Sequence, residues 1–414
     1  MTASSAVEFL IWLLIAASII ALIAIRLRIP YTVALVLGGL ALGSLHLPIL
    51  QSIYQSDRPD WLTPDVILIL FLPVLLFQGS LNINLRQLLE NLSPILILAT
   101  GGVVVATLVT GYLVFWFVGV PLMMAFLFGA IISATDPIAV LSIAKEMAVS
   151  KRLAMLLEGE SLFNDGTAVV LFQILLAAVL TGNFSLASGS GNFIVSVLGG
   201  ATIGLALGYI ASKITARIDD PQIEITLTMI VAYSSYLVAH HFNVSGVIAT
   251  VMAGLIVGNL GTKGMSSRTR VALSSFWEYA AFVINSILFL LVGLEVRVAD
   301  LVRDWRAVAL TIGAVLIGRV LSVYGLSSMI NLISRKIDFR SQHVLVWGGL
   351  HGALSLALAL SLGTNLVGRD RILTITFGVV AFSMIVQGLT IKSLIRALGI
   401  STVAEDESDR ITAQ

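Results

Sequence analysis

Cysteine is absent from the 414 residues, which excludes disulfide bonds and metal sites built on thiolates. Charged residues are scarce as well: they make up 11% of the chain, whereas a soluble domain carries about 25%. The formal net charge of +1 gives no basic field that would attract nucleic acid, so no nucleic-acid partner is expected. Hydrophobic residues account for 58% of the chain, which is typical of a polytopic membrane protein whose solvent is the lipid bilayer.

Long apolar segments predict that the chain crosses a membrane many times. The segments are about 18–25 residues long, enough to span a bilayer, and charged or Gly/Pro/Asn/Asp-rich stretches separate them. We therefore predict an all-α membrane protein with thirteen transmembrane helices. Their approximate ranges are 7–25, 30–47, 64–80, 94–116, 121–143, 153–181, 192–214, 222–241, 244–260, 273–295, 306–333, 342–364 and 372–394.

The distribution of Lys and Arg predicts the orientation of these helices. No cation precedes the first range and Arg26 and Arg28 follow it, which is the reverse of a secretory signal, so we expect it to be retained. With the N-terminus outside and the C-terminus in the cytoplasm, sixteen of the 24 cations lie at cytoplasmic ends and six lie outside. This bias follows the positive-inside rule. We expect a membrane domain over 1–396 and a short cytoplasmic tail over 397–414.

Two of the predicted helices are interrupted. The fifth contains Pro137, which lacks an amide donor and disfavours helical geometry at Asp136. The twelfth contains three glycines within residues 348–352. Broken helices occur at membrane depth only where they line a cavity or are buried in protein. The two interrupted helices are seven spans apart and so cross in opposite directions, which predicts inverted repeats with a site at the midplane.

Polar residues within the apolar sequence predict what the site binds. The sixth range contains Glu160, Ser161, Asn164 and Asp165, and a carboxylate near the bilayer centre costs about 2.5–3.5 kcal/mol on insertion scales. Ser161 and Asp165 are four residues apart and share a helix face, while Glu160 and Asn164 share the neighbouring face. Such a cost is tolerated where the carboxylate binds an ion or transfers a proton, so the cluster predicts ion transport.

The unwound turn of the fifth range adds oxygen ligands. Its free backbone carbonyls and the Asp136 carboxylate suit a hard cation such as Na⁺, and the simpler alternative is a proline kink in which Asp136 caps the next half-helix. A hydroxyl and a carboxylate from Ser161 and Asp165 complete the candidate metal ligands, which here belong to a transported monovalent cation. Glu160 needs a separate partner, and Arg319 is the one cation that lies deep within a predicted span rather than near its end. We therefore predict a structural ion pair between Glu160 and Arg319.

Four motifs resemble those of the cation/proton antiporter-1 family, and in particular its bacterial sodium/proton antiporters related to eukaryotic sodium/hydrogen exchangers. The motifs are residues 134–137, 159–166, 318–319 and 347–350, in that order along the chain. The resemblance covers essentially all of residues 7–396. The motif that ends in Asn164-Asp165-Gly166 is the most specific of the four.

The resemblance implies a homodimer in a bacterial inner membrane. A dimerisation domain would flank a six-helix core, around 94–181 and 306–394, that contains the crossed, unwound helices. Asp165 would bind the ion and the proton with support from Asp136, Ser161, Asn164 and Thr135, and Glu160 and Arg319 would match the family's buried ion pair.

Two positions depart from the family's pattern. Gln78 stands where the family usually has an acidic residue, and it removes one negative charge from the ion site. His351 stands where the family usually has arginine, so it is a candidate for pH modulation or an ordinary structural substitution.

These expectations define a transporter rather than an enzyme, with no cofactor. We expect electroneutral 1:1 exchange of Na⁺ or Li⁺ for H⁺ by alternating access, with the two ions competing for Asp165. A K⁺/H⁺ exchanger is the main alternative. More remote alternatives are a cation channel and an intramembrane aspartyl protease that would use Asp136 and Asp165.

Overall fold

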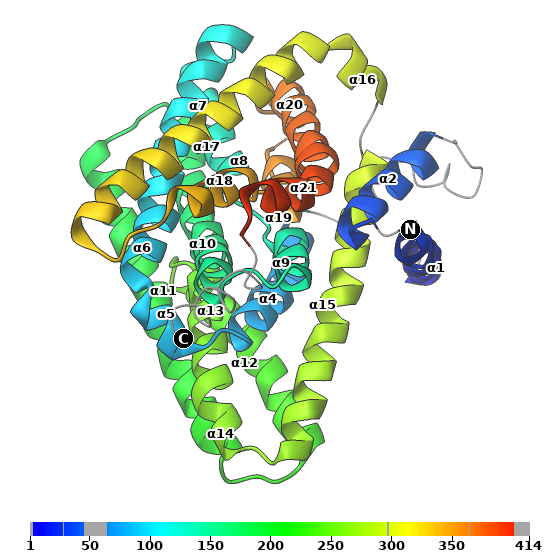
Figure 1. Ribbon diagram of the computed structural model, residues 1–414, viewed down its shortest axis with the longest axis vertical. Helices are drawn as coiled ribbons and strands as arrows, with labels where there is room; N and C mark the ends of the chain where they lie inside the picture. The colour runs from blue at the N-terminus through cyan, green and yellow to red at the C-terminus, as the bar shows by residue number, and fades with distance from the viewer. Residues whose placement is uncertain (1–2, 28, 45–63, 296–297, 364, 401–414) are drawn as a thin grey trace, which may run out of the picture.

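The computed structural model describes residues 3–27, 29–44, 64–295, 298–363 and 365–400, and every element in these ranges is a helix (Figure 1). The helices are α1 (Ala3–Leu27), α2 (Tyr31–Ser44), α4 (Pro64–Leu81), α5 (Leu85–Glu90), α6 (Leu92–Leu96), α7 (Gly102–Val118), α8 (Leu122–Ser133), α9 (Ile138–Glu146), α10 (Lys151–Thr181), α11 (Leu186–Thr215), α12 (Pro221–His241), α13 (Gly246–Ile256), α14 (Thr262–Gly264), α15 (Ser267–Glu295), α16 (Val298–Arg303), α17 (Trp305–Ile333), α18 (Phe339–Trp347), α19 (Ala353–Leu360), α20 (Arg369–Phe382) and α21 (Gly388–Leu398). Three π-helical segments, η1 (Ile97–Gly101), η2 (Val257–Gly261) and η3 (Ser383–Gln387), join helices end to end.

The helices confirm the all-α prediction and identify a multi-pass membrane protein. Within the described residues, nine helices are long and apolar enough to cross a bilayer. Shorter apolar helices occupy Tyr31–Gly43, Leu68–Leu81 and Leu122–Ser133. That all thirteen predicted ranges cross the membrane stays a prediction. The end of the range 30–47 and most of the predicted tail lie outside the described residues, and α21 continues to Leu398, just inside the range predicted as tail.

Both predicted interruptions are present. The fifth predicted range is divided into α8 and α9, with Ala134 already in an extended conformation and Pro137 immediately before α9. The twelfth is divided into α18 and α19, and Gly352 is extended just before α19 begins. The backbone amide of Asp136 donates to the Leu350 carbonyl at 2.6 Å. The two breaks therefore meet each other, and each supplies a partner for backbone that the other leaves unpaired.

The helices pack in two groups. In the first, which we call the crossing bundle (α6–α10 and α17–α21), α7 packs on α8 and α17, and α20 packs on α17 and α19. In the second, the flanking bundle (α1, α2, α4 and α11–α15), α2 packs on α15, and α13 packs on α4, α11 and α12. Figure 1 shows α7, α17 and α20 at the upper end and α12 and α14 at the lower end. Contacts of α10 with α11 and α13, and of α19 with α4 and α15, join the two bundles.

The helix that carries most of the polar motif is fixed at its first turn. Ser150 caps α10 by accepting a hydrogen bond from the Leu153 amide at 3.3 Å. The Arg152 guanidinium donates to the carbonyls of Lys336 at 2.6 Å and Arg335 at 2.8 Å, and to Asn91 Oδ1 at 3.1 Å. These bonds tie the start of α10 to the connection between α17 and α18.

Glycines bring α11 and α13 close together in the flanking bundle. Gly200, Gly204 and Gly208 recur every four residues, and a Cβ at Gly204 would overlap the Ala249 carbonyl. Small residues at this spacing allow close helix packing in lipid, where dispersion contacts replace the hydrophobic effect between helices.

Replacing Gly204 with alanine should therefore destabilise the protein. We expect Gly204→Ala to lower the free energy of unfolding by about 1–3 kcal/mol, because the new methyl group must push α11 away from α13. Gly313→Ala is the matched control, since a methyl group added to Gly313 in α17 would meet no neighbouring atom within 4 Å; there the better helix former should leave stability unchanged or raise it by about 1 kcal/mol. Thermal unfolding in detergent would compare the two, and equal melting temperatures would contradict the close packing of α11 on α13.

Candidate functional site

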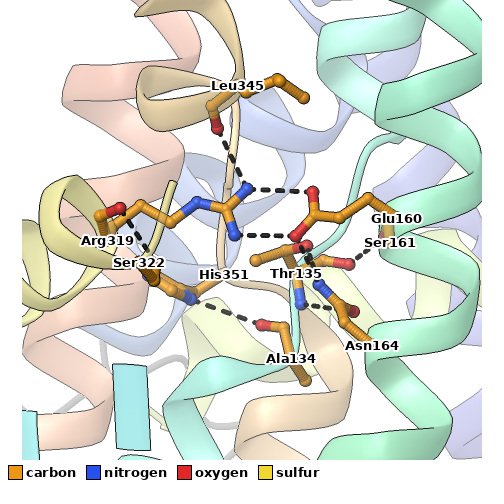
Figure 2. A network of polar contacts seen from close by, with 9 residues as sticks. All are labelled: Ala134, Thr135, Glu160, Ser161, Asn164, Arg319, Ser322, Leu345 and His351. Atoms are coloured by element: carbon orange, nitrogen blue, oxygen red, sulfur yellow. Dashed lines mark hydrogen bonds and ion pairs between the residues drawn. The ribbon is translucent and has the colours of Figure 1, made fainter. Parts of the chain in front are cut away.

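The crossing of the two breaks is closed by hydrogen bonds to unwound backbone. The Ala134 carbonyl accepts from His351 Nδ1 at 3.3 Å and from Ser355 Oγ at 3.4 Å. Gly352 packs so closely that an added Cβ would lie 2.7 Å from the Asp136 Cβ. His351 is buried, and its amide donates to Ser383 Oγ in η3 at 2.9 Å. His351 therefore holds the two breaks together (Figure 2).

Thr135, in the first break, is held by two side chains from α10. The Ser161 hydroxyl donates to the Thr135 carbonyl. The Asn164 side chain donates from Nδ2 to Thr135 Oγ1 at 2.6 Å and accepts from the Thr135 amide at 3.4 Å. All three residues are buried, so these bonds replace those that a continuous helix would have made. The Ser161 oxygen keeps lone pairs for a cation after it has donated its hydrogen.

Glu160 and Arg319 form a buried ion pair with two parallel bonds. Nη1 donates to Oε1 at 2.7 Å and Nη2 donates to Oε2 at 3.0 Å, with side-chain exposures of 4% for Glu160 and 11% for Arg319. Arg319 Nη2 also donates to the Leu345 carbonyl in α18 at 3.0 Å, and Asn164 Nδ2 lies 3.3 Å from Glu160 Oε1. Figure 2 shows that the ion pair continues through Asn164 to the unwound turn. The pair thus links α10, α17 and α18.

A cavity of about 720 Å³ opens in front of the crossing. Its lining includes five of the predicted site residues, namely Gln78, Thr135, Asp136, Ser161 and Asp165. Asn164 and His351 do not line it: Asn164 lies behind Thr135, and His351 lies on the other break. Five predicted residues therefore lie in the cavity wall, and Asn164 and His351 lie behind it; their roles in ion binding stay predictions.

Asp165 differs from Glu160 and Asp136, because its side chain has no hydrogen-bond or ion-pair partner among the described residues. It is half-buried and faces the cavity, and no hydrogen bond or ion pair joins its side chain to a residue within the described ranges. Asp136 differs, because its Oδ1 accepts from the Ile138 amide at 2.9 Å and so caps α9. Asp136 and Glu160 are the like charges that act on Asp165, and Arg319 already neutralises Glu160. A cation or a proton is therefore needed to balance the charge of Asp165.

The chemistry of these donors suits a monovalent cation. Carboxylate, hydroxyl and amide oxygens surround the cavity in front of Asp165, and hard cations prefer such ligands. Among the described residues, no three His, Cys, Asp or Glu side chains gather in a way that could hold a resident metal ion.

Eight further polar residues line the cavity that were not predicted as site residues, among them Lys145, Glu158, Glu278 and Asn285. Lys145 and Glu158 belong to α9 and α10, and the positive charge of Lys145 acts on Glu158. Glu278 and Asn285 belong to α15. Asn285 could have been found from the sequence, because it is a lone amide within the apolar run 280–294.

Comparisons with known proteins point to one family. The family model described as "Sodium/hydrogen exchanger, transmembrane" matches residues 13–397. The chain is 41% identical over 399 residues to the Na⁺/H⁺ antiporter NhaH of Halobacillus dabanensis, which covers 95% of this chain and 98% of that protein. It is 39% identical over 394 residues to the Na⁺/H⁺ antiporter NhaP of Pseudomonas aeruginosa, covering 90% and 92% of the two chains. Its fold is similar to that of the sodium proton antiporter MjNhaP1 from Methanocaldococcus jannaschii at pH 8, with a TM-score of 0.78, 23% identity, and coverage of 96% and 99%.

The buried ion pair makes a stability prediction. Glu160→Gln should lower the free energy of unfolding by about 3–5 kcal/mol, because it leaves the Arg319 guanidinium buried without its counter-charge. The exchange Glu160→Arg with Arg319→Glu should restore part of the loss. The control is Glu90→Gln, which breaks the exposed Arg86–Glu90 pair and should leave the melting temperature unchanged. If Glu160→Gln has the same melting temperature in detergent as the wild type, the pair does not tie the helices together.

Proposed function

This chain belongs to the sodium/hydrogen exchanger family, and on that basis we propose that it is a secondary active Na⁺/H⁺ antiporter in which Na⁺ and H⁺ compete for Asp165. One observation carries the proposal: Asp165 is a carboxylate with no partner in the described part of the chain, and it faces a cavity where two broken helices meet. Thr135, Asp136, Ser161 and Gln78 supply further oxygen atoms around the same cavity. No nucleotide or cofactor has a role in this scheme.

Competition at one carboxylate is sufficient for obligatory exchange. Asp165 can be neutralised by a cation or by a proton, and in either state the site can change sides. An empty, charged site meets a desolvation barrier, because a bare carboxylate is unfavourable in an apolar environment. Each turnover therefore moves one ion of each kind, and the proposed exchange is 1:1 and electroneutral. The carboxylate serves Li⁺ as well as Na⁺, since both are hard cations.

The movement that changes sides is assigned to the crossing bundle. It spans nearly the ranges 94–181 and 306–394 that the resemblance assigns to a mobile core, and it is joined to the flanking bundle by few elements. The Glu160–Arg319 pair ties α10 to α17 and α18, so these helices would move together. We assign the flanking bundle to the scaffold, and to the interface of a homodimer.

The cavity would face the cytoplasm in the state described. Lys145 and Asn82 line it, and both lie at helix ends that the charge bias places inside. With the N-terminus outside and the C-terminus in the cytoplasm, the protein would lie in the inner membrane of a bacterial cell. Asp165 is then accessible from the cytoplasm in this structure.

Selectivity among cations depends on the charge around Asp165. Gln78 offers a carbonyl oxygen but no negative charge, and it lines the cavity beside Asp165. A weaker field lowers the benefit of binding a small, strongly hydrated ion, so Gln78 is the feature that favours K⁺ as an alternative substrate. His351 has a structural role in this scheme, because its bonds to Ala134 and Ser383 hold the two broken helices together.

Neutralising Asp165 should abolish exchange while the protein still folds. Asp165→Asn removes the titrating group, so acridine orange dequenching on addition of Na⁺ to everted vesicles should disappear, while the melting temperature in detergent should not fall. Asp370→Asn is the matched control, because its side chain is 98% exposed at the start of α20. Exchange at the wild-type rate by Asp165→Asn would end the proposal.

The 1:1 stoichiometry predicts that the exchange rate does not depend on the membrane potential. In proteoliposomes with a Na⁺ gradient, the initial rate of H⁺ movement should not change when a membrane potential of either sign is imposed, because 1:1 exchange moves no net charge. A rate that rises with one polarity and falls with the other would rule out 1:1 exchange. The same assay with Na⁺, Li⁺ and K⁺ in turn distinguishes the substrates: a response larger for K⁺ than for Na⁺ would favour the K⁺/H⁺ alternative.

A further inference from the structure

One wall of the cavity belongs to the flanking bundle. Five residues of α15 line it, at the spacing of one helix face: Glu278, Ala281, Phe282, Asn285 and Leu288. Glu278 is exposed, Phe282 is 45% exposed and Asn285 is 8% exposed. This face of α15 therefore runs from solvent at Glu278 into the interior at Asn285, on the opposite bundle from Asp165.

Asn285 is a buried amide with no partner in the protein. No hydrogen bond joins its side chain to the parts of the chain that the structure describes, although the adjacent Ser286 bonds both Tyr31 and the Phe282 carbonyl. Buried polar groups are normally hydrogen-bonded, and the surrounding sequence of α15 is apolar. The Asn285 amide lines the cavity, so its partner must be something that enters the cavity.

Glu278 lies two turns before Asn285 on the same face. Ser274 Oγ donates to Glu278 Oε1 at 2.9 Å, which orients the carboxylate at the exposed end of the cavity. Seven residues correspond to about 10 Å along an α-helix, so one ion cannot touch both side chains at once. A negative charge at the mouth of a cleft with low-dielectric walls raises the local concentration of cations.

We propose that α15 provides a second subsite for the alkali cation, in which Glu278 attracts the ion at the cavity mouth and the Asn285 amide oxygen is a ligand to it near Asp165. The inference rests on the proposed function, because it adds ligands to the same transported ion. Asn285 faces the cavity that Gln78 also lines, and both amides replace water around a dehydrating cation without adding charge. The cation would thus be held between the two bundles rather than by the crossing bundle alone.

The position of Asn285 has a consequence for the two sides of the membrane. Asp165 belongs to the crossing bundle and Asn285 to the flanking bundle, so the two can share a cation only while the cavity is open as it is in this structure. When the crossing bundle moves, Asp165 leaves the α15 wall. Asn285 should therefore increase the apparent affinity for Na⁺ on the cavity side and have no effect on the other side.

Sided transport measurements on two isosteric variants test this subsite. Asn285→Leu removes the amide oxygen and should raise the apparent KM for Na⁺ by about three- to ten-fold in everted vesicles, which present the cytoplasmic side outward, and leave it unchanged in right-side-out vesicles. Asn285→Asp adds a charge and should lower KM on the same side at alkaline pH. Tyr279→Phe is the control on α15, because Tyr279 is 69% exposed and does not line the cavity.

Ionic strength separates the role of Glu278 from that of Asn285. Glu278→Gln should raise KM for Na⁺ at low ionic strength and lose this effect at high choline chloride, because salt screens an exposed charge. The effect of Asn285→Leu should persist in high salt. A role in folding alone would produce neither the sidedness nor this difference in salt dependence.

The outcomes distinguish the subsite from the proposed function. If Asn285→Leu and Asn285→Asp both exchange normally and have the wild-type KM for Na⁺ on both sides of the membrane, the proposed subsite is wrong. The proposed Na⁺/H⁺ exchange is not affected by that result. Equal increases in KM on both sides for the two variants also overturn the subsite. If Asn285→Leu does not accumulate in the membrane, Asn285→Asp still tests the subsite. A lower KM for Na⁺ on the cytoplasmic side alone supports the subsite, and an unchanged KM contradicts it. Absence of Na⁺/H⁺ exchange in the wild type would overturn the proposed function itself, and the subsite with it.

Discussion

Backbone groups that are unwound inside a bilayer must find hydrogen-bond partners, and the site depends on how this chain meets that requirement. The two breaks satisfy each other in part, through the bond from the Asp136 amide to the Leu350 carbonyl. Ser161 and Asn164 satisfy Thr135 from α10, and His351 satisfies Ala134 from the second break. Because protein groups meet most of these needs, a permanently unwound segment can persist at membrane depth and expose oxygen atoms to a cavity.

The same arrangement gives three neighbouring carboxylates different roles. Glu160 is neutralised by Arg319 and takes no part in the cavity lining. Asp136 is partly engaged as the cap of α9. Asp165 alone has no partner among the described residues and faces the cavity, so it is the group whose charge must be balanced by an ion that enters. Asn164 joins the ion pair to the unwound turn, so a change at Arg319 would reach Thr135 in the cavity wall through three bonds, those of Arg319 to Glu160, Glu160 to Asn164 and Asn164 to Thr135.

Local chemistry made much of this predictable from the sequence. Pro137 lacks an amide donor, and three glycines lie within residues 348–352; both features disfavour a continuous helix, so both breaks were predicted in place. Arg319 was the one cation predicted deep within a span rather than near its end, which left Glu160 a single choice of partner. The contact between Asp136 and Leu350 was not predictable, because it joins residues far apart in the chain and depends on how α8 and α18 pack. The short helix α5 and the π-helical segments were also missed, since each depends on tertiary packing rather than on a local sequence signal. Asn285 was missed although the apolar run around it is a local signal.

Sodium ions and protons exclude each other from Asp165 in the proposed mechanism, so Na⁺ binding should release protons. Calorimetric titration of the purified protein with Na⁺, in buffers of different ionisation enthalpy, counts the protons set free for each ion bound. The account predicts close to one proton per Na⁺ while the site is protonated, and an affinity for Na⁺ that weakens as the solution is acidified. Na⁺ binding with no proton released, and with the same affinity in acid as in alkali, would contradict it.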